Sequence, residues 1–124
     1  MVTLTIVSLL SCYTDSGQQK TALDSQFSAA HPSSPCLSYS VGSTPFGYCL
    51  YKMSETVKSI EGIEPYCDWA GDWRDDCIYN WVVTKTAPDS GIGTMELLGL
   101  CGDIPDCAFR VVEHRPHADI TETL

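Results

Sequence analysis

Residues 67–82 read CDWAGDWRDDCIYNWV and decide the fold, because they place two cysteines around a polar turn and then open a helix. From the second cysteine onward, apolar side chains and one lysine stem recur at positions 0, 1, 4, 5 and 8, namely Cys77, Ile78, Trp81, Val82 and Lys85. That spacing is typical of one face of an α-helix. Asp75 and Asp76 stand before this face, where carboxylates cap free N–H groups and meet the positive end of the helix dipole.

The same pattern occurs in three places along the chain. Residues 49–53 read CLYKM, residues 77–81 read CIYNW and residues 107–111 read CAFRV, so their cysteines lie 28 and 30 residues apart. Each copy runs cysteine, apolar, aromatic, polar, apolar, which indicates a degenerate internal repeat. We expect the first copy to continue as a helix through Val57. Shorter helices over 60–69 and 94–100 precede the other two copies. Three stacked helical hairpins, with cysteines at their turns, would bury faces that none can bury alone.

Breaking residues follow each copy and support this arrangement. Gly62 and Pro65 follow the first copy, APDSG at 87–91 follows the second and Pro116 follows the third. Pro105 stands before Cys107, where proline suits a first helical turn. A β interpretation competes with the helical one, because residues 78–83 and 109–112 are rich in strand-forming side chains.

Length, charge and composition restrict the class of protein. A chain of 124 residues suffices for one modest core and not for two. It has 7 basic and 16 acidic side chains and a formal net charge of −9, which argues against DNA, RNA or anionic lipid as a partner. Apolar residues make up 44% and charged residues 19%, so we expect a folded chain.

The N-terminal segment indicates export. Residues 2–10 read VTLTIVSLL, which is too short to span a bilayer and has the length of the apolar region of a secretory signal. Together with Ser11 and Cys12, the end of this segment (LLSC, residues 9–12) resembles the lipobox of bacterial lipoprotein precursors. In that family the signal is cut before the cysteine, and the thiol carries a diacylglycerol. The resemblance implies a lipid anchor on Cys12. A simple signal peptide with a later cut and an ordinary N-terminal strand remain alternatives.

The cysteine count agrees with that resemblance. Of seven cysteines, six remain once Cys12 is set aside, and an even set in an exported small domain predicts a disulfide framework. Pairing of neighbours respects the repeat, so we predict the bonds Cys36–Cys49, Cys67–Cys77 and Cys101–Cys107. The predicted fold is mostly α, a small disulfide-stapled helical-hairpin repeat domain after a flexible N-terminal tether.

The predicted domain organisation follows from these signals. It comprises a signal peptide over 1–11, a lipidated cysteine and flexible linker over 12–35, the cysteine-rich repeat domain over 36–116 and a C-terminal tail over 117–124. The linker is rich in Ser, Gln, Thr, Ala and Asp, which is typical of a tether. Leu23 and Phe27 lie four residues apart, so this part could instead form one short helical turn.

The titratable side chains give little indication of chemistry. His114 and His117 flank Pro116, which would break a helix carrying both, and His31 lies far away, so we expect no metal site. Acidic side chains gather around Trp69 and Trp73 and could form an acid–base pair; they are Asp68, Asp72, Asp75 and Asp76. Aspartates at a turn before a helix are also what capping and solubility require. We therefore expect no enzyme activity and no cofactor.

Aromatic side chains offer a candidate binding surface. Five of them are concentrated in the second repeat, namely Tyr66, Trp69, Trp73, Tyr79 and Trp81. The predicted binding surface consists of Trp69, Trp73, Tyr79 and Trp81. Aromatic residues dominate binding hot spots, and an acidic rim would favour a cationic or neutral protein partner. We expect a non-catalytic lipoprotein of the cell envelope, anchored in the membrane by lipid, with a binding or structural role. The alternative is a soluble secreted cysteine-rich effector or toxin-like protein that binds a receptor or an enzyme.

Overall fold

The computed structural model describes residues 15–115, with side chains from residue 22 onward. Its α-helices are α2 (Asp15–Ala30), α3 (Thr44–Lys52), α4 (Ile60–Asp68), α5 (Arg74–Thr84), α6 (Thr94–Cys101) and α7 (Cys107–His114). Short 3-10 helices lie between them, at η1 (Pro35–Ser38), η2 (Ser54–Thr56), η3 (Gly71–Trp73) and η4 (Pro88–Ser90). Over this range no residue is in a strand. The mostly α prediction is confirmed, and the β alternative is wrong because its two segments lie in α5 and α7.

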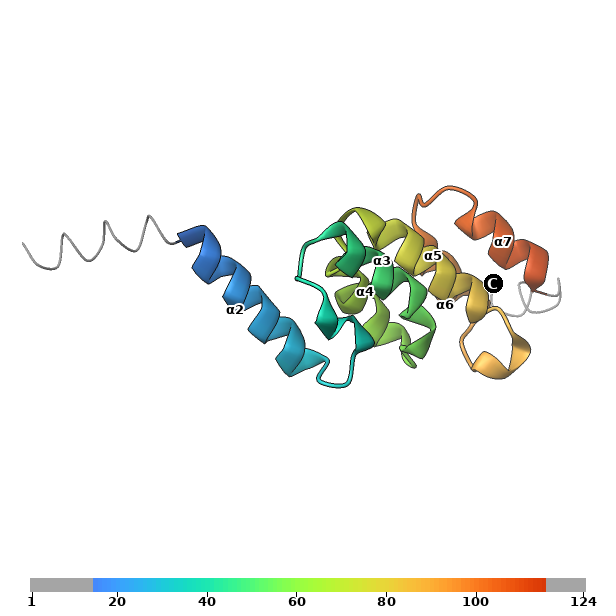
Figure 1. The fold of residues 1–124 in the computed structure, drawn as a ribbon. Coiled ribbons are helices and arrows are strands. Elements are labelled where there is room, and N and C mark those ends of the chain that lie inside the picture. The colour runs from blue at the N-terminus through green and yellow to red at the C-terminus, as the bar shows by residue number, and fades with distance from the viewer. Residues whose placement is uncertain (1–14, 116–124) are drawn as a thin grey trace, which may run out of the picture.

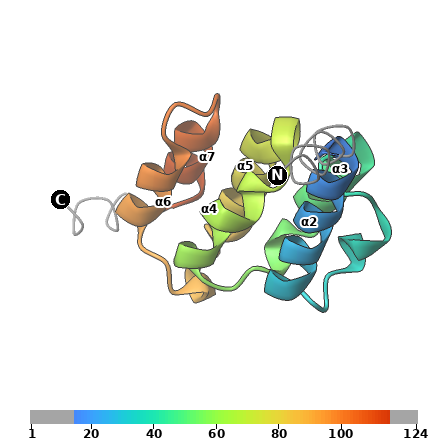
Figure 2. The ribbon, with the colours of Figure 1, turned by 90° about the vertical axis from the view of Figure 1, so that its left-hand side faces the viewer.

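Helix α5 is the centre of the domain. It contacts α3, α4, α6 and α7, and Figure 2 shows the α4–α5 hairpin between α3 and the α6–α7 pair. Because it is covered from several directions, α5 supplies much of the core. The largest fully buried apolar side chains are Trp81, Phe27, Phe46, Leu50, Ile63, Ile78, Leu97, Val82 and Val111.

All three predicted disulfides are present. Their S–S distances are 2.02 Å for Cys36–Cys49, 2.10 Å for Cys67–Cys77 and 2.08 Å for Cys101–Cys107. The second bond joins the end of α4 to the first turn of α5, and the third joins the end of α6 to the start of α7. These two bonds are therefore staples across the turns of α-helical hairpins, as the repeat predicts.

The first copy of the repeat differs from the other two. Cys36 lies in η1, and Cys49 lies in the second half of α3 rather than at the start of a helix. Helix α3 begins at Thr44, where Ser43 Oγ accepts a hydrogen bond from the Phe46 N–H, and it ends at Lys52. The expected helix from Cys49 to Val57 is wrong in register, because this N-cap and a proline in the first turn start the helix earlier.

The predicted linker over 12–35 requires a second correction. Residues 15–30 form α2, a helix that projects from the body of the domain in Figure 1, and η1 begins at Pro35. Phe27 is fully buried, with its ring 4.9 Å from that of Phe46 and 5.5 Å from that of Trp69. The Asp24 carboxylate accepts a hydrogen bond of 3.0 Å from the Val41 N–H. The packed domain thus includes the end of α2, which the turn at Leu23 and Phe27 only partly indicated.

Arg115 holds the C-terminal end of the domain together. Its guanidinium donates to the carbonyl oxygens of Thr86, Lys85 and Ile92 at 2.8, 2.9 and 2.8 Å and to the Thr94 hydroxyl at 3.2 Å. These groups lie at the end of α5, in the following loop and at the start of α6. The guanidinium group has five N–H donors, so this one side chain can donate hydrogen bonds to several carbonyl oxygens that take no part in helical hydrogen bonding.

Candidate functional site

The four aromatic side chains of the predicted binding surface do not form one surface. Trp81 is fully buried, and its indole N–H donates a hydrogen bond of 2.7 Å to the Val57 carbonyl. Its inclusion in a surface is wrong, because α5 is covered on the face that carries it. A buried indole whose one polar group is satisfied is part of the core.

Trp69 and Tyr79 are half-buried and lie in two different places. Trp69 packs edge to face on the Phe27 ring and so joins α2 to the body of the domain. Tyr79 accepts a hydrogen bond of 3.1 Å from Arg110 Nε, which links α5 to α7. Both side chains therefore have packing partners within the domain, and neither lies with Trp73.

Trp73 belongs to an aromatic group that sequence reasoning missed. Its ring stacks on that of Tyr51 at 5.4 Å and an interplanar angle of 21°, and it meets the Tyr48 ring edge to face at 5.1 Å. The Tyr48 side chain is 45% exposed, and the other two are half-buried. We call Tyr48, Tyr51 and Trp73 the aromatic face. The spacing of Tyr48 and Tyr51, three residues apart on a helix, was the signal that could have indicated it.

A glycine allows Trp73 to reach this position. Gly47 lies in α3 against the backbone of Ala70 and the Trp73 side chain. A Cβ on Gly47 would meet the Ala70 carbonyl oxygen and stand 3.0 Å from Trp73 Cδ1. The close approach of α3 to the turn before α5 therefore depends on the missing side chain at this position.

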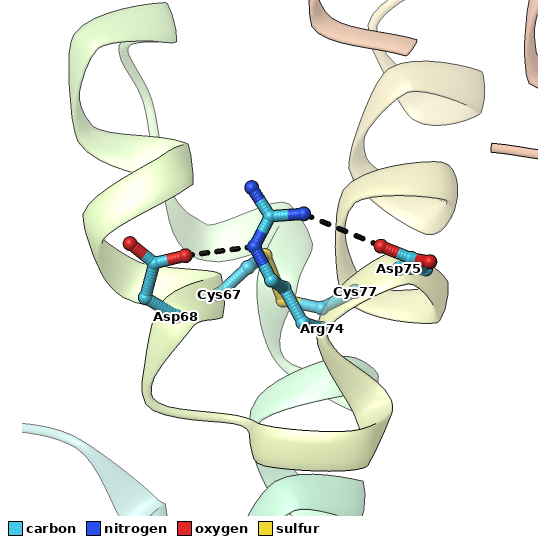
Figure 3. A network of polar contacts seen from close by, with 5 residues as sticks. All are labelled: Cys67, Asp68, Arg74, Asp75 and Cys77. Carbon is cyan, nitrogen blue, oxygen red and sulfur yellow. Dashed lines mark hydrogen bonds and ion pairs between the residues drawn. A yellow bond between two sulfur atoms is a disulfide. The ribbon is translucent and has the colours of Figure 1, made fainter. Parts of the chain in front are cut away.

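Two of the four clustered aspartates, Asp68 and Asp75, form exposed ion pairs with Arg74. Figure 3 shows Arg74 between two carboxylates, with Nε 2.8 Å from Asp68 and Nη1 3.3 Å from Asp75. The hydrogen bond to Asp68 is the largest cause that raises the pKa of Arg74. The side chains of Asp68 and Asp75 are 62% and 63% exposed and lie on opposite sides of the guanidinium. Both carboxylates are thus exposed to solvent, and each pairs with the same guanidinium rather than with the other.

The histidines are separated in space as well as in sequence. The His31 ring lies 4.9 Å from that of Phe27 and 5.5 Å from that of Tyr66, and burial there lowers the pKa of His31. His114 lies on α7, 3.7 Å from Glu113, and His117 lies outside the described residues. Within 15–115 no three His, Cys, Asp or Glu side chains are grouped as metal ligands.

A hollow adjoins the aromatic face at Trp73. It has a volume of about 330 Å³ and lies between the 42–44 segment and the turn over 70–73. Trp73 is its aromatic wall, Asp72 and Asp76 are its acidic groups, and Ser43 and Thr44 are its hydroxyl groups. The arrangement can hold a group that is both polar and able to stack on an indole.

Comparison of the chain with protein-family models, with curated proteins and with solved structures finds no match. Among the helices of residues 15–115, none is long and apolar enough to cross a bilayer.

Proposed function

We propose that this protein is a non-catalytic lipoprotein of the cell envelope whose small disulfide-stapled domain binds another protein. The observation that carries the proposal is the pairing of the cysteines. The six in the described residues form three bonds among themselves, so none is left over for Cys12. Disulfides of this kind persist in oxidising compartments outside the cytosol. A single additional cysteine at the end of a signal-like segment agrees with lipidation of Cys12, which lies outside the described residues.

The surface of the domain favours a binding role. The aromatic face places an exposed tyrosine beside a tryptophan, and such side chains supply much of the energy of protein interfaces. The net charge of −9 favours a cationic or neutral partner and disfavours nucleic acid. In this proposal the lipid anchor attaches the protein to the membrane, and the domain meets its partner at the aqueous side.

The mass of the mature protein tests the anchor. The full chain is expressed in a bacterium with an intact lipoprotein-processing pathway and is analysed by intact-mass spectrometry. We expect a chain that begins at Cys12 with an acyl-sized gain in mass. The variant Cys12→Ser should lose the added mass and leave the membrane fraction. The variant Ser16→Ala, four residues further on, is the control and should be processed as the parent chain is.

Two results would contradict the anchor. If Met1 is retained, the N-terminal segment is not a signal, and the proposal fails. A cut at another position, with release of the protein into the medium, would instead support the alternative of a secreted cysteine-rich effector. The three disulfides agree with that alternative equally well, because they require only an oxidising compartment.

A further inference from the structure

We propose that the aromatic face and its adjoining hollow form a docking surface for a basic segment of a partner protein, with one arginine or lysine side chain seated against Trp73. This inference deepens the proposed binding function and rests on it. It names the chemistry of the partner and the place where the partner binds.

The first argument is the charge of the hollow. The aspartates near Trp73 differ in whether they form an ion pair with a basic side chain. Arg74 pairs with Asp68 and Asp75, which compensates those two carboxylates. Asp72 and Asp76 form no ion pair with any residue of the described range, and both are exposed. These two carboxylates, which have no basic side chain as a partner, are the ones that line the hollow. A cation entering it would meet negative charge without displacing an internal partner.

The aromatic wall is the second argument. The Trp73 indole lines the hollow and is half-buried, so its position is fixed by packing while part of it meets solvent. Tryptophan gives the most favourable ring face for a cation. The aromatic face already attracts one cation within the chain, because Lys52 Nζ lies 5.8 Å from the Tyr48 ring centroid and 6.0 Å from that of Tyr51. Lys52 is in the last turn of α3, whereas the hollow takes its residues from the start of that helix.

Size is the third argument. A volume of about 330 Å³ is at the small end of the range for binding pockets, and it is large enough for one arginine or lysine side chain. The Thr44 hydroxyl in its lining can accept a hydrogen bond from an ammonium or a guanidinium. The Ser43 hydroxyl already accepts the Phe46 N–H and donates to the Ser40 carbonyl, which leaves it one lone pair for the ligand. The uncharged residues of the segment would lie over the exposed ring of Tyr48, because Lys52 already places a positive charge beside that ring.

A titration followed by NMR tests the docking surface. The probe is a short peptide of alternating arginine and glycine, added to the full chain with its disulfides intact, and the readout is the indole N–H signal of Trp73. The variant Trp73→Phe assigns that signal. The control peptide carries citrulline in place of arginine, because citrulline has nearly the same shape without the charge. We expect a saturable shift with the arginine peptide only, weakened by added salt.

Two variants with equal changes in charge locate the binding. Asp72→Asn with Asp76→Asn removes both carboxylates of the hollow, and Glu61→Gln with Glu64→Gln removes two exposed carboxylates of α4. The first pair should weaken binding about five- to tenfold, as loss of two partly exposed charge contacts implies. The second pair should weaken it less than twofold. Equal weakening by both pairs, equal binding of the citrulline peptide or no saturable shift at Trp73 would each overturn the inference. In each of these three cases, the role left for Asp72 and Asp76 would be a favourable interaction with the positive end of the α5 dipole. The result is independent of the mass measurement on Cys12, so a failure here is distinguishable from failure of the anchor.

Discussion

Replacement of Gly47 by alanine should destabilise the domain, although alanine is the better helix former. In an exposed helix interior the change from glycine to alanine stabilises by about 1 kcal/mol. At Gly47, however, the new Cβ would meet the Ala70 carbonyl oxygen and stand 3.0 Å from Trp73 Cδ1. A backbone oxygen cannot rotate away, so α3 must move from the turn before α5. Overpacking costs about 1–3 kcal/mol, and a clash with a backbone atom belongs in the upper part of that range, about 2–3 kcal/mol. Subtracting the helical gain of about 1 kcal/mol leaves a net loss of about 1–2 kcal/mol.

A second glycine in the same chain provides the matched control. Gly99 also lies inside a helix, α6, and a Cβ built there has no neighbouring atom within 4 Å. Gly99→Ala should therefore stabilise the domain by about 0.5–1 kcal/mol. Urea unfolding of the oxidised chain, followed by far-UV circular dichroism, measures both changes. If Gly47→Ala proved as stable as the parent chain or more so, the close approach of α3 to Trp73 would be refuted.

Three further predictions concern bonds that hold the described domain together. Reduction with dithiothreitol should unfold it, because each disulfide contributes about 2.5–3 kcal/mol by the chain-entropy estimate; a circular dichroism spectrum unchanged by the reductant would contradict this. Arg115→Lys should cost about 2–3 kcal/mol in urea unfolding, since one ammonium cannot span the carbonyls of Thr86 and Ile92 that the guanidinium reaches, and equal stability would contradict it. Burial raises the pKa of Tyr66 from 10.0 to about 12, so the unfolded chain loses this proton first. The stability that this residue contributes should be complete below pH 10 and should be lost between pH 10 and 12, an effect of up to about 2–3 kcal/mol. Tyr66→Phe should show less of this alkaline loss, and equal pH profiles for the two chains would contradict the assignment.

The sequence was sufficient for the parts of the fold that depend on neighbours in the chain. The disulfides close short loops, and the helical face of α5 repeats within two turns, so spacing alone predicts both. Helix α2 was not predicted as a whole helix, because the part of it that packs on the domain gives no repeating pattern in the sequence. Its contact with the core is made by Phe27 alone among the fully buried side chains, and one buried residue produces no periodic pattern.

The same distinction holds for the candidate site, where helical spacing predicts which side chains are buried but not which helices pack against the exposed ones. Trp81 lies four residues after Cys77 on the face that the periodicity already assigns to the core, so its place on a surface conflicted with the helix prediction. Trp73 could not be distinguished from Trp69 by any local rule, because both lie in the same acidic turn. Their different roles depend on which helix packs against each, α3 for one and α2 for the other.

The positions of the disulfides relative to the aromatic face give them a role beyond stability. Trp73 lies inside the loop closed by Cys67 and Cys77, and Tyr48 directly precedes Cys49, which is bonded to Cys36. The two sides of the face are thus each fixed by a different covalent bond. Binding to a surface that is already ordered costs less conformational entropy than binding to one that must become ordered. A small domain with few side chains to contribute can therefore gain affinity from rigidity, and local disulfides provide that rigidity where the aromatic side chains meet.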